Sequence, residues 1–166
     1  MILGLSLAAF TMLHAVISVL GIVSGFVVVL GWISGRSSAG WTLLFLVTTV
    51  LTSATGFLFP STSFGPPQVL GILSLAVLAV AIPALYVFHL AGICRVVYIL
   101  SAAAALYFNV FVGVAQAFQK LPLLQPLAPT QSEPPFLIAQ IAVLAIFIVL
   151  AFLSVKRFHP SAVADA

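Results

Sequence analysis

The chain has 166 residues, of which 64% are hydrophobic and only 4% are charged. A soluble domain needs roughly a quarter of its residues charged to cover a water-facing surface, so this composition excludes that class and predicts a protein that lies in a lipid bilayer. The formal net charge of +3 comes from five Lys and Arg residues spread along the chain, a pattern that predicts membrane topology and no nucleic-acid partner.

Apolar stretches long enough to cross a membrane recur along the chain. We expect spans at about residues 4–33, 41–59, 69–90, 95–118 and 136–155. At 1.5 Å per residue, each is long enough for a hydrocarbon core of about 30 Å. The first has no basic segment before it and exceeds a signal-peptide core, so we expect it to be retained. The sequence therefore predicts an all-α fold, a single-domain transmembrane five-helix bundle.

The connections between the spans predict the orientation. The turn from 91 to 94 is very short, but Arg95 beside His89 favours a turn there. An odd number of spans puts the termini on opposite sides, and cytoplasmic segments carry an excess of Lys and Arg. We expect N-out/C-in, with the proline-rich connection 119–135 and Lys120 outside. The residues expected inside are Arg36, Arg95, Lys156 and Arg157.

A polar seam runs along the fourth span, where Asn109 and Gln116 share one helical face at about 100° per residue. An amide in hydrocarbon costs several kcal/mol unless it is hydrogen-bonded, so other spans should bring partners to the same depth. Counted at 1.5 Å per residue from the inner boundary, the polar residues of four spans reach about 21–27 Å, and Gln116 about 31 Å. The four are His14, Thr55, Asn109 and Gln140.

These side chains predict an outward-facing polar pocket with the 119–135 connection and Glu133 as a lid. Its candidate ligand-binding residues are His14, Thr52, Thr55, Asn109, Gln116 and Gln140. In the alternative interpretation the same groups only hydrogen-bond between helices and fix their packing, as they do in many membrane bundles. An ionisable group within a span is a functional candidate by default, which favours a role for His14.

Small residues on the first span predict a close helix contact. Gly21-Ile-Val-Ser-Gly25 is a GxxxG pattern, which lets another backbone approach closely. We expect this Gly21/Gly25 face to dock a membrane-protein partner or a second copy of the chain, in addition to the surrounding lipid bilayer. The fifth span has only Gln140 and Ser154 as polar residues and should be the most peripheral helix.

Catalysis, metals and cofactors find little basis in the sequence. The only carboxylates, Glu133 and Asp165, lie outside the spans, so no acid pair and no acidic metal cage can form within them. The single cysteine, Cys94, excludes an intrachain disulfide and a Cys-based zinc site. About 20 Å of depth separates His14 from His89, too far for two axial ligands of one haem. We expect no enzymatic activity, no cofactor and no metal.

Two runs carry a resemblance: Thr49 to Pro60 (TVLTSATGFLFP) and Leu127 to Phe136 (LAPTQSEPPF). They resemble signatures of a group of uncharacterised bacterial inner-membrane proteins of about this length, which implies a multi-pass protein of the cell inner membrane and no particular chemistry. The size and span count are also similar to the translocator-protein family. The tryptophan-rich signature of that family is absent, since only Trp32 and Trp41 occur, so porphyrin or sterol binding is not implied.

The first interpretation is a compact, non-enzymatic protein that acts as a small-ligand-binding or accessory subunit through the outer pocket. A small-solute transporter or channel component is an alternative, but it requires the polar seam to continue inward. The inner halves of these faces carry mainly Ala102, Ala105 and Gly25, which offer little hydrogen bonding. A purely structural subunit of a larger membrane complex is a further alternative.

Overall fold

The computed structural model describes residues 2–60 and 65–160, and within them the chain is helical with no β-strand. The elements are α1 (Leu7–Ile33), α2 (Ala39–Gly56), α3 (Pro66–Tyr86), α4 (Ile93–Lys120), the short 3₁₀ helix η1 (Gln125–Leu127) and α5 (Pro134–Arg157). All five α-helices of this described part are long and apolar enough to cross a membrane. The predicted all-α, five-helix bundle is therefore confirmed, and it is consistent with a multi-pass membrane protein.

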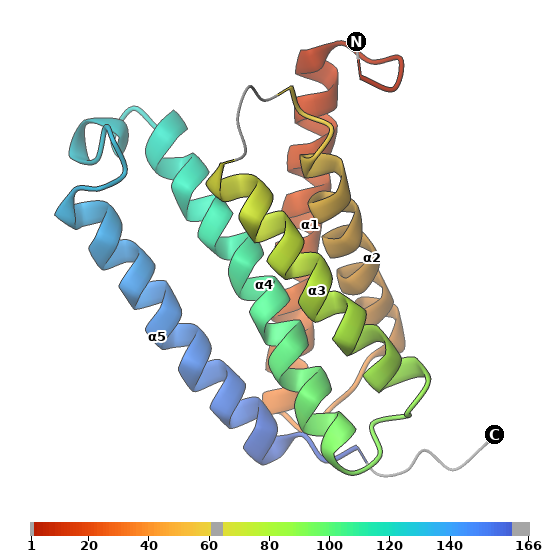
Figure 1. Ribbon diagram of the computed structural model, residues 1–166. Coiled ribbons are helices and arrows are strands. Elements are labelled where there is room, and N and C mark those ends of the chain that lie inside the picture. The colour runs from red at the N-terminus through yellow and green to blue at the C-terminus, as the bar shows by residue number, and fades with distance from the viewer. Residues whose placement is uncertain (1, 61–64, 161–166) are drawn as a thin grey trace.

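Consecutive helices run antiparallel, so each end of the bundle collects alternate connections (Figure 1). The start of α1 and the α4–α5 connection lie at one end, which we call the connection end. The α1–α2 and α3–α4 turns and the end of α5 lie at the other, which we call the basic end because of the residues gathered there. These residues are Arg36, Arg95, Lys156 and Arg157.

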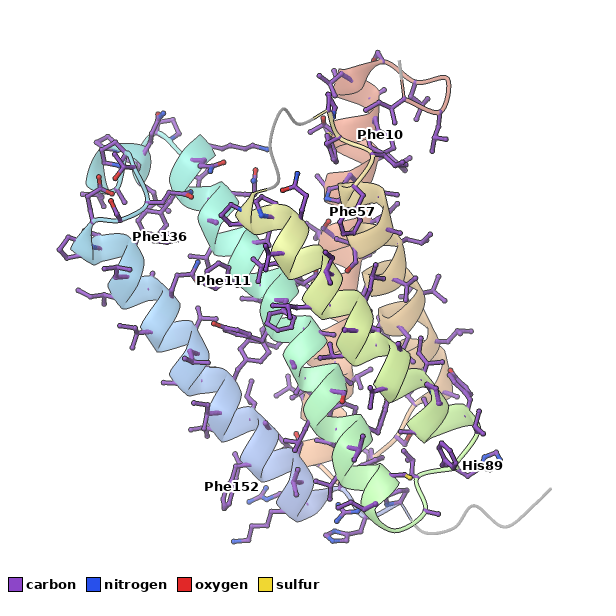
Figure 2. The ribbon with its side chains drawn as sticks, in the orientation of Figure 1. Phe10, Phe57, His89, Phe111, Phe136 and Phe152 are labelled. Carbon is purple, nitrogen blue, oxygen red and sulfur yellow. The ribbon has the colours of Figure 1, made fainter. Side chains whose placement is uncertain are left out.

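The helices pack unevenly. α1 packs against α2, α4 and α5, while α3 packs against α2 and α4. α5 lies at the edge of the bundle beside α4, and Phe152 points away from it (Figures 1 and 2). The buried side chains of α5 are Phe136, Gln140, Phe147 and Ser154. Most of its surface is apolar and exposed, as expected for the most peripheral helix of a membrane bundle.

The helix ends follow local chemistry that hydropathy does not report. α1 begins at Leu7 because the Ser6 hydroxyl accepts a hydrogen bond from the Ala9 N–H, a standard N-cap. α5 begins at Pro134, before the predicted boundary at 136, because proline in the first helical turn lacks an N–H that would be unpaired there anyway. The short turn predicted between the third and fourth spans is present as residues 87–92.

Glycine sets the closest helix contacts in the core. A Cβ added at Gly25 would lie 2.5 Å from Leu106 Cδ1 and 2.9 Å from the Phe45 ring. Gly21, one turn closer to the connection end, is also buried. The Gly21/Gly25 face, which the sequence predicts as a docking surface for a partner, lies against α2 and α4 of the same chain. The close backbone approach expected of GxxxG is thus made within the bundle.

Aromatic residues fill the core at the basic end. The Trp32 ring lies 5.3 Å from that of Tyr98 and 5.8 Å from that of Phe158, measured between centroids. All three side chains are almost completely buried. Phe158, just beyond the end of α5, therefore anchors that end of the chain beneath α1 and α4.

Candidate functional site

His14 of α1 and Thr55 of α2 form a hydrogen bond near the connection end. The distance from His14 Nδ1 to Thr55 Oγ1 is 2.8 Å. Because the Thr55 hydroxyl donates its own proton to the carbonyl of Leu51, the imidazole must supply the proton of this bond from Nδ1. Nε2 is then left as an acceptor on a half-buried ring, which packs edge-on against Phe59 at 5.1 Å.

Threonines continue from this pair toward the middle of α2. Thr52 and Thr49 follow Thr55 at steps of three residues, so they lie on neighbouring parts of one helical face. Both are buried, and the hydroxyl of neither has a hydrogen-bond partner among the described residues. Thr48, beside Thr49, donates instead to the carbonyl of Leu44.

The side chain of Asn109 on α4 and the threonine hydroxyls of α2 lie close to the same glycine of α1, Gly21. The Cβ position of Gly21 lies 3.2 Å from Thr48 Oγ1, 3.3 Å from Asn109 Nδ2 and 3.4 Å from Thr49 Oγ1. The Asn109 Nδ2 group is buried and has no partner in the described chain. Because glycine has no side chain, Gly21 leaves room for polar groups of α2 and α4 to lie close together at this point. We call the whole set the polar file: His14, Thr48, Thr49, Thr52, Thr55 and Asn109.

The polar file runs from the half-buried His14 to a closed end in the core. His14 is seven residues or about 10 Å from Gly21 along α1. One turn beyond Gly21, Leu106 and Phe45 close over Gly25, and both side chains are fully buried. Polar groups therefore extend from the connection end to the middle of the bundle and stop at an apolar layer.

The remaining predicted residues lie elsewhere. Gln140 of α5 donates from Nε2 to the carbonyl of Phe111 at 3.1 Å. Phe111 and Asn109 are two residues apart on α4, about 200° around the helix, so Gln140 lies on the opposite side of α4 from the polar file. Gln116 pairs with Gln119 on its own helix at 3.5 Å. The structure thus brings His14, Thr52, Thr55 and Asn109 to one interface, leaves Gln140 on the other side of α4, and gives Gln116 a partner on its own helix.

Thr48 and Thr49 belong to the polar file although they were not among the candidates selected from the sequence. Their spacing of four and three residues from Thr52 places them on the same side of α2, and this spacing is the signal that could have found them. Ser53 faces another neighbour, since its hydroxyl donates to Ser74 of α3 at 2.9 Å. The polar residues of α2 therefore serve two different interfaces.

The α4–α5 connection, predicted as a lid, folds onto the ends of its own two helices. Phe118 and Phe136 pack at 5.5 Å with Ala128 buried against them, and Gln131 donates to the carbonyl of Ala115. Figure 1 shows the connection on the α4 and α5 side of the bundle, away from the start of α1 that precedes His14.

Glu133 organises the end of this connection. Its carboxylate accepts hydrogen bonds from the Thr130 hydroxyl and from the backbone N–H groups of Thr130 and Ser132. Desolvation favours the protonated form, but these hydrogen bonds outweigh it and lower the pKa of the Glu133 carboxyl below its ordinary value. Asp165, the other carboxylate of the chain, lies outside the described residues.

Two cavities lie at the basic end. The larger, about 510 Å³, is bounded by the end of α1 and the start of α2 and is lined by residues that include Arg36 and Trp41. The smaller, about 120 Å³, is lined by residues that include Tyr86 and Tyr98. Ser37 and Thr42 line both, so the two cavities adjoin.

No group of three or more His, Cys, Asp or Glu that could hold a metal ion occurs in the described ranges 2–60 and 65–160. Figure 2 shows His89 at the opposite end of the bundle from Phe10, which precedes His14 by one turn of α1. The candidate site therefore consists of neutral hydrogen-bonding groups around one imidazole. Comparison with protein-family models, with curated proteins and with solved structures finds no match for this chain.

Proposed function

We propose that this chain is a non-enzymatic multi-pass protein of the bacterial cell inner membrane whose polar file binds a small polar ligand from the outer side. The observation that carries the proposal is the set of polar atoms that are buried in the polar file without a hydrogen-bond partner among the described residues: Thr49 Oγ1, Thr52 Oγ1 and Asn109 Nδ2. Leaving a buried polar group unpaired costs about 1–3 kcal/mol, so packing alone is a poor reason to collect three of them. A small hydrogen-bonding ligand would pair all three.

Charge distribution supports the N-out/C-in orientation in this proposal. Four of the five Lys and Arg residues lie at the basic end and only Lys120 at the connection end, which favours a cytoplasmic basic end. Cys94, in the first turn of α4, allows a direct test because it is the only cysteine. In right-side-out vesicles a membrane-impermeant maleimide should leave Cys94 unlabelled until the membrane is opened. A Ser132→Cys variant without Cys94 should label at once, and the reverse pattern would contradict the orientation.

The apolar layer weighs against the transporter or channel alternative. Gly25, Phe45 and Leu106 lie between the polar file and the cavities at the basic end, so the polar file does not continue to these cavities among the described residues. A purely structural partner of a larger complex would need a surface other than the Gly21/Gly25 face, because α2 and α4 cover that face. Ligand binding without passage fits the arrangement best.

The experiment is purification in a mild detergent followed by mass spectrometry of the small molecules that co-elute. Asn109→Leu removes the amide of the polar file, while Gln140→Leu removes a buried amide on the other side of α4 and is the matched control. A species that co-purifies with wild type and Gln140→Leu but is lost from Asn109→Leu supports the proposal. Finding no such species, or finding it equally in Asn109→Leu, overturns it.

A further inference from the structure

The two adjoining cavities at the basic end form a site that is separate from the polar file. The larger cavity is walled by the last turn of α1, the 34–38 turn and the start of α2, and its charged side chain is Arg36. The smaller cavity extends from it past Ser37 and Thr42 to the buried ring of Tyr98. One ligand can therefore contact the outer chamber and the inner chamber together.

The outer chamber favours an anion. Arg36 is exposed, and the one carboxylate among the described residues, Glu133, is at the other end of the bundle. The first turn of α2 contains no acidic residue, and the Ser38 side chain makes no capping hydrogen bond to it. Unpaired N–H groups and the positive end of the helix dipole add to the charge of Arg36.

The inner chamber favours a hydroxyl group. Tyr98, which lines it, is 1% exposed, and its phenolic oxygen is buried beside the Thr42 hydroxyl, without a hydrogen bond of good geometry to any residue that the structure describes. A buried hydroxyl is stabilised when it gains a partner, and the other polar residues of this chamber, Ser37, Thr42 and Tyr86, also carry hydroxyls. The small volume of about 120 Å³ admits only a compact polar group.

The surroundings place the site at the membrane interface. Trp41 lines the outer chamber and is 44% exposed, a position typical of tryptophan at headgroup level. Val27 and Leu30, on the lining toward the middle of α1, are exposed apolar side chains. A ligand with a charged head in the chamber would lay an apolar tail along them.

We propose that this site binds an anionic phospholipid whose headgroup carries hydroxyl groups, of which phosphatidylglycerol is the simplest example. The phosphodiester lies between Arg36 and the start of α2, the headgroup hydroxyls reach Tyr98 and Thr42, and the acyl chains follow Val27 and Leu30. The inference does not depend on the ligand of the polar file, which lies beyond the apolar layer.

Native mass spectrometry of the full chain tests the headgroup preference. The protein is exchanged into equal amounts of phosphatidylglycerol, phosphatidic acid and phosphatidylethanolamine with identical acyl chains. We expect retention in the order phosphatidylglycerol, phosphatidic acid, phosphatidylethanolamine. Equal retention of phosphatidylglycerol and phosphatidylethanolamine overturns the proposal. So does complete displacement of the lipid by millimolar glycerol phosphate or inorganic phosphate, which would assign the site to a soluble phosphate.

Variants separate the parts of the site. Arg36→Gln should lower phosphatidylglycerol retention about tenfold, the size expected for a charged hydrogen bond. Arg157→Gln removes an exposed charge at the same end that lines neither cavity and should change little. Tyr98→Phe should remove the preference for phosphatidylglycerol over phosphatidic acid. Equal losses in the two arginine variants, or an unchanged preference in Tyr98→Phe, contradict the assignment.

A further variant guards against effects of misfolding. Ala39→Asp places a carboxylate in the first turn of α2, where it stabilises the helix through the dipole but repels a phosphate. The thermal midpoint should hold or rise while phosphatidylglycerol retention falls. If retention is unchanged in a stable Ala39→Asp protein, the phosphate does not bind at the start of α2 and the proposal fails.

Discussion

Arg95, in the first turn of α4, donates hydrogen bonds to the backbone carbonyl oxygens of Val155 and Phe158 at the end of α5. The last carbonyls of a helix have no partner within that helix, so the Arg95 guanidinium of α4 caps the C-terminal end of α5. The α4–α5 connection joins the same two helices at the opposite end of the bundle. The most exposed helix of the described chain is therefore held at both of its ends.

Replacing Arg95 should loosen α5. Arg95→Met keeps most of the apolar stem and removes both hydrogen bonds, and hydrogen bonds to a charged group contribute about 1.5–3 kcal/mol. We expect the free energy of unfolding in detergent to fall by about 2 kcal/mol. Arg157→Met, which removes an exposed charge, should change it by less than about 0.5 kcal/mol. A loss in Arg95→Met no larger than in this control would show that the clamp contributes nothing.

Enlarging Gly25 should force α1 away from its neighbours. A Cβ there meets Leu106 and Phe45 at distances that require both to move, and overpacking of this kind typically costs about 1–3 kcal/mol. Thermal unfolding of Gly25→Ala measures the loss, and adding Leu106→Ala should reverse the steric part of it. Gly40→Ala is the matched control, because nothing lies within 4 Å of its Cβ position. If Gly25→Ala is as stable as Gly40→Ala, the close contact is not real.

The His14–Thr55 hydrogen bond should appear as a coupling between two positions. Side-chain hydrogen bonds between membrane helices average about 0.6 kcal/mol, so a double-mutant cycle of His14→Leu and Thr55→Val should give a coupling energy of about that size. Thr11→Val paired with His14→Leu is the control, because the Thr11 hydroxyl bonds to Leu7 of its own helix. Strictly additive losses for His14 and Thr55 would argue against the bond.

Acid should loosen the α4–α5 connection through Glu133. The pKa of this carboxyl is lower in the folded than in the unfolded chain. Its contribution to the stability of the connection is therefore complete above the unfolded-state pKa of about 4.3 and is lost as the pH falls through the folded-state pKa. Hydrogen exchange of the Thr130 and Ser132 amides, which bond to the carboxylate, should accelerate beyond the intrinsic pH trend in that window. In Glu133→Gln the extra acid-dependent step should be absent; if it remains, another group is responsible.

The number and type of helices could be predicted because each depends on local length and hydropathy alone. The exact ends could not, since the start of α1 depends on the Ser6 cap and the start of α5 on Pro134. These signals act over three or four residues and do not register in an average over a whole span.

The composition of the polar file could be predicted only in part. Counting residues gives the depth along one helix and predicts similar levels for His14 and Asn109, but Asn109 lies beside Gly21, about 10 Å along α1 from His14. The direction in which Gln140 faces could not be counted, because it depends on which side of α4 receives α5. The cavities at the basic end depend on the path of the 34–38 turn and on the burial of Tyr98, which no pattern in the sequence reports.

The layer of Phe45 and Leu106 over Gly25 has an electrical consequence in a membrane. A proton taken up by the imidazole of His14 would exchange with the aqueous phase at the connection end, because the apolar layer of Phe45 and Leu106 separates His14 from the basic end. Such a charge would sense part of the transmembrane voltage without carrying a current. The bundle can therefore hold a half-buried imidazole near one end and a buried amide near its middle while the apolar layer separates both from the basic end.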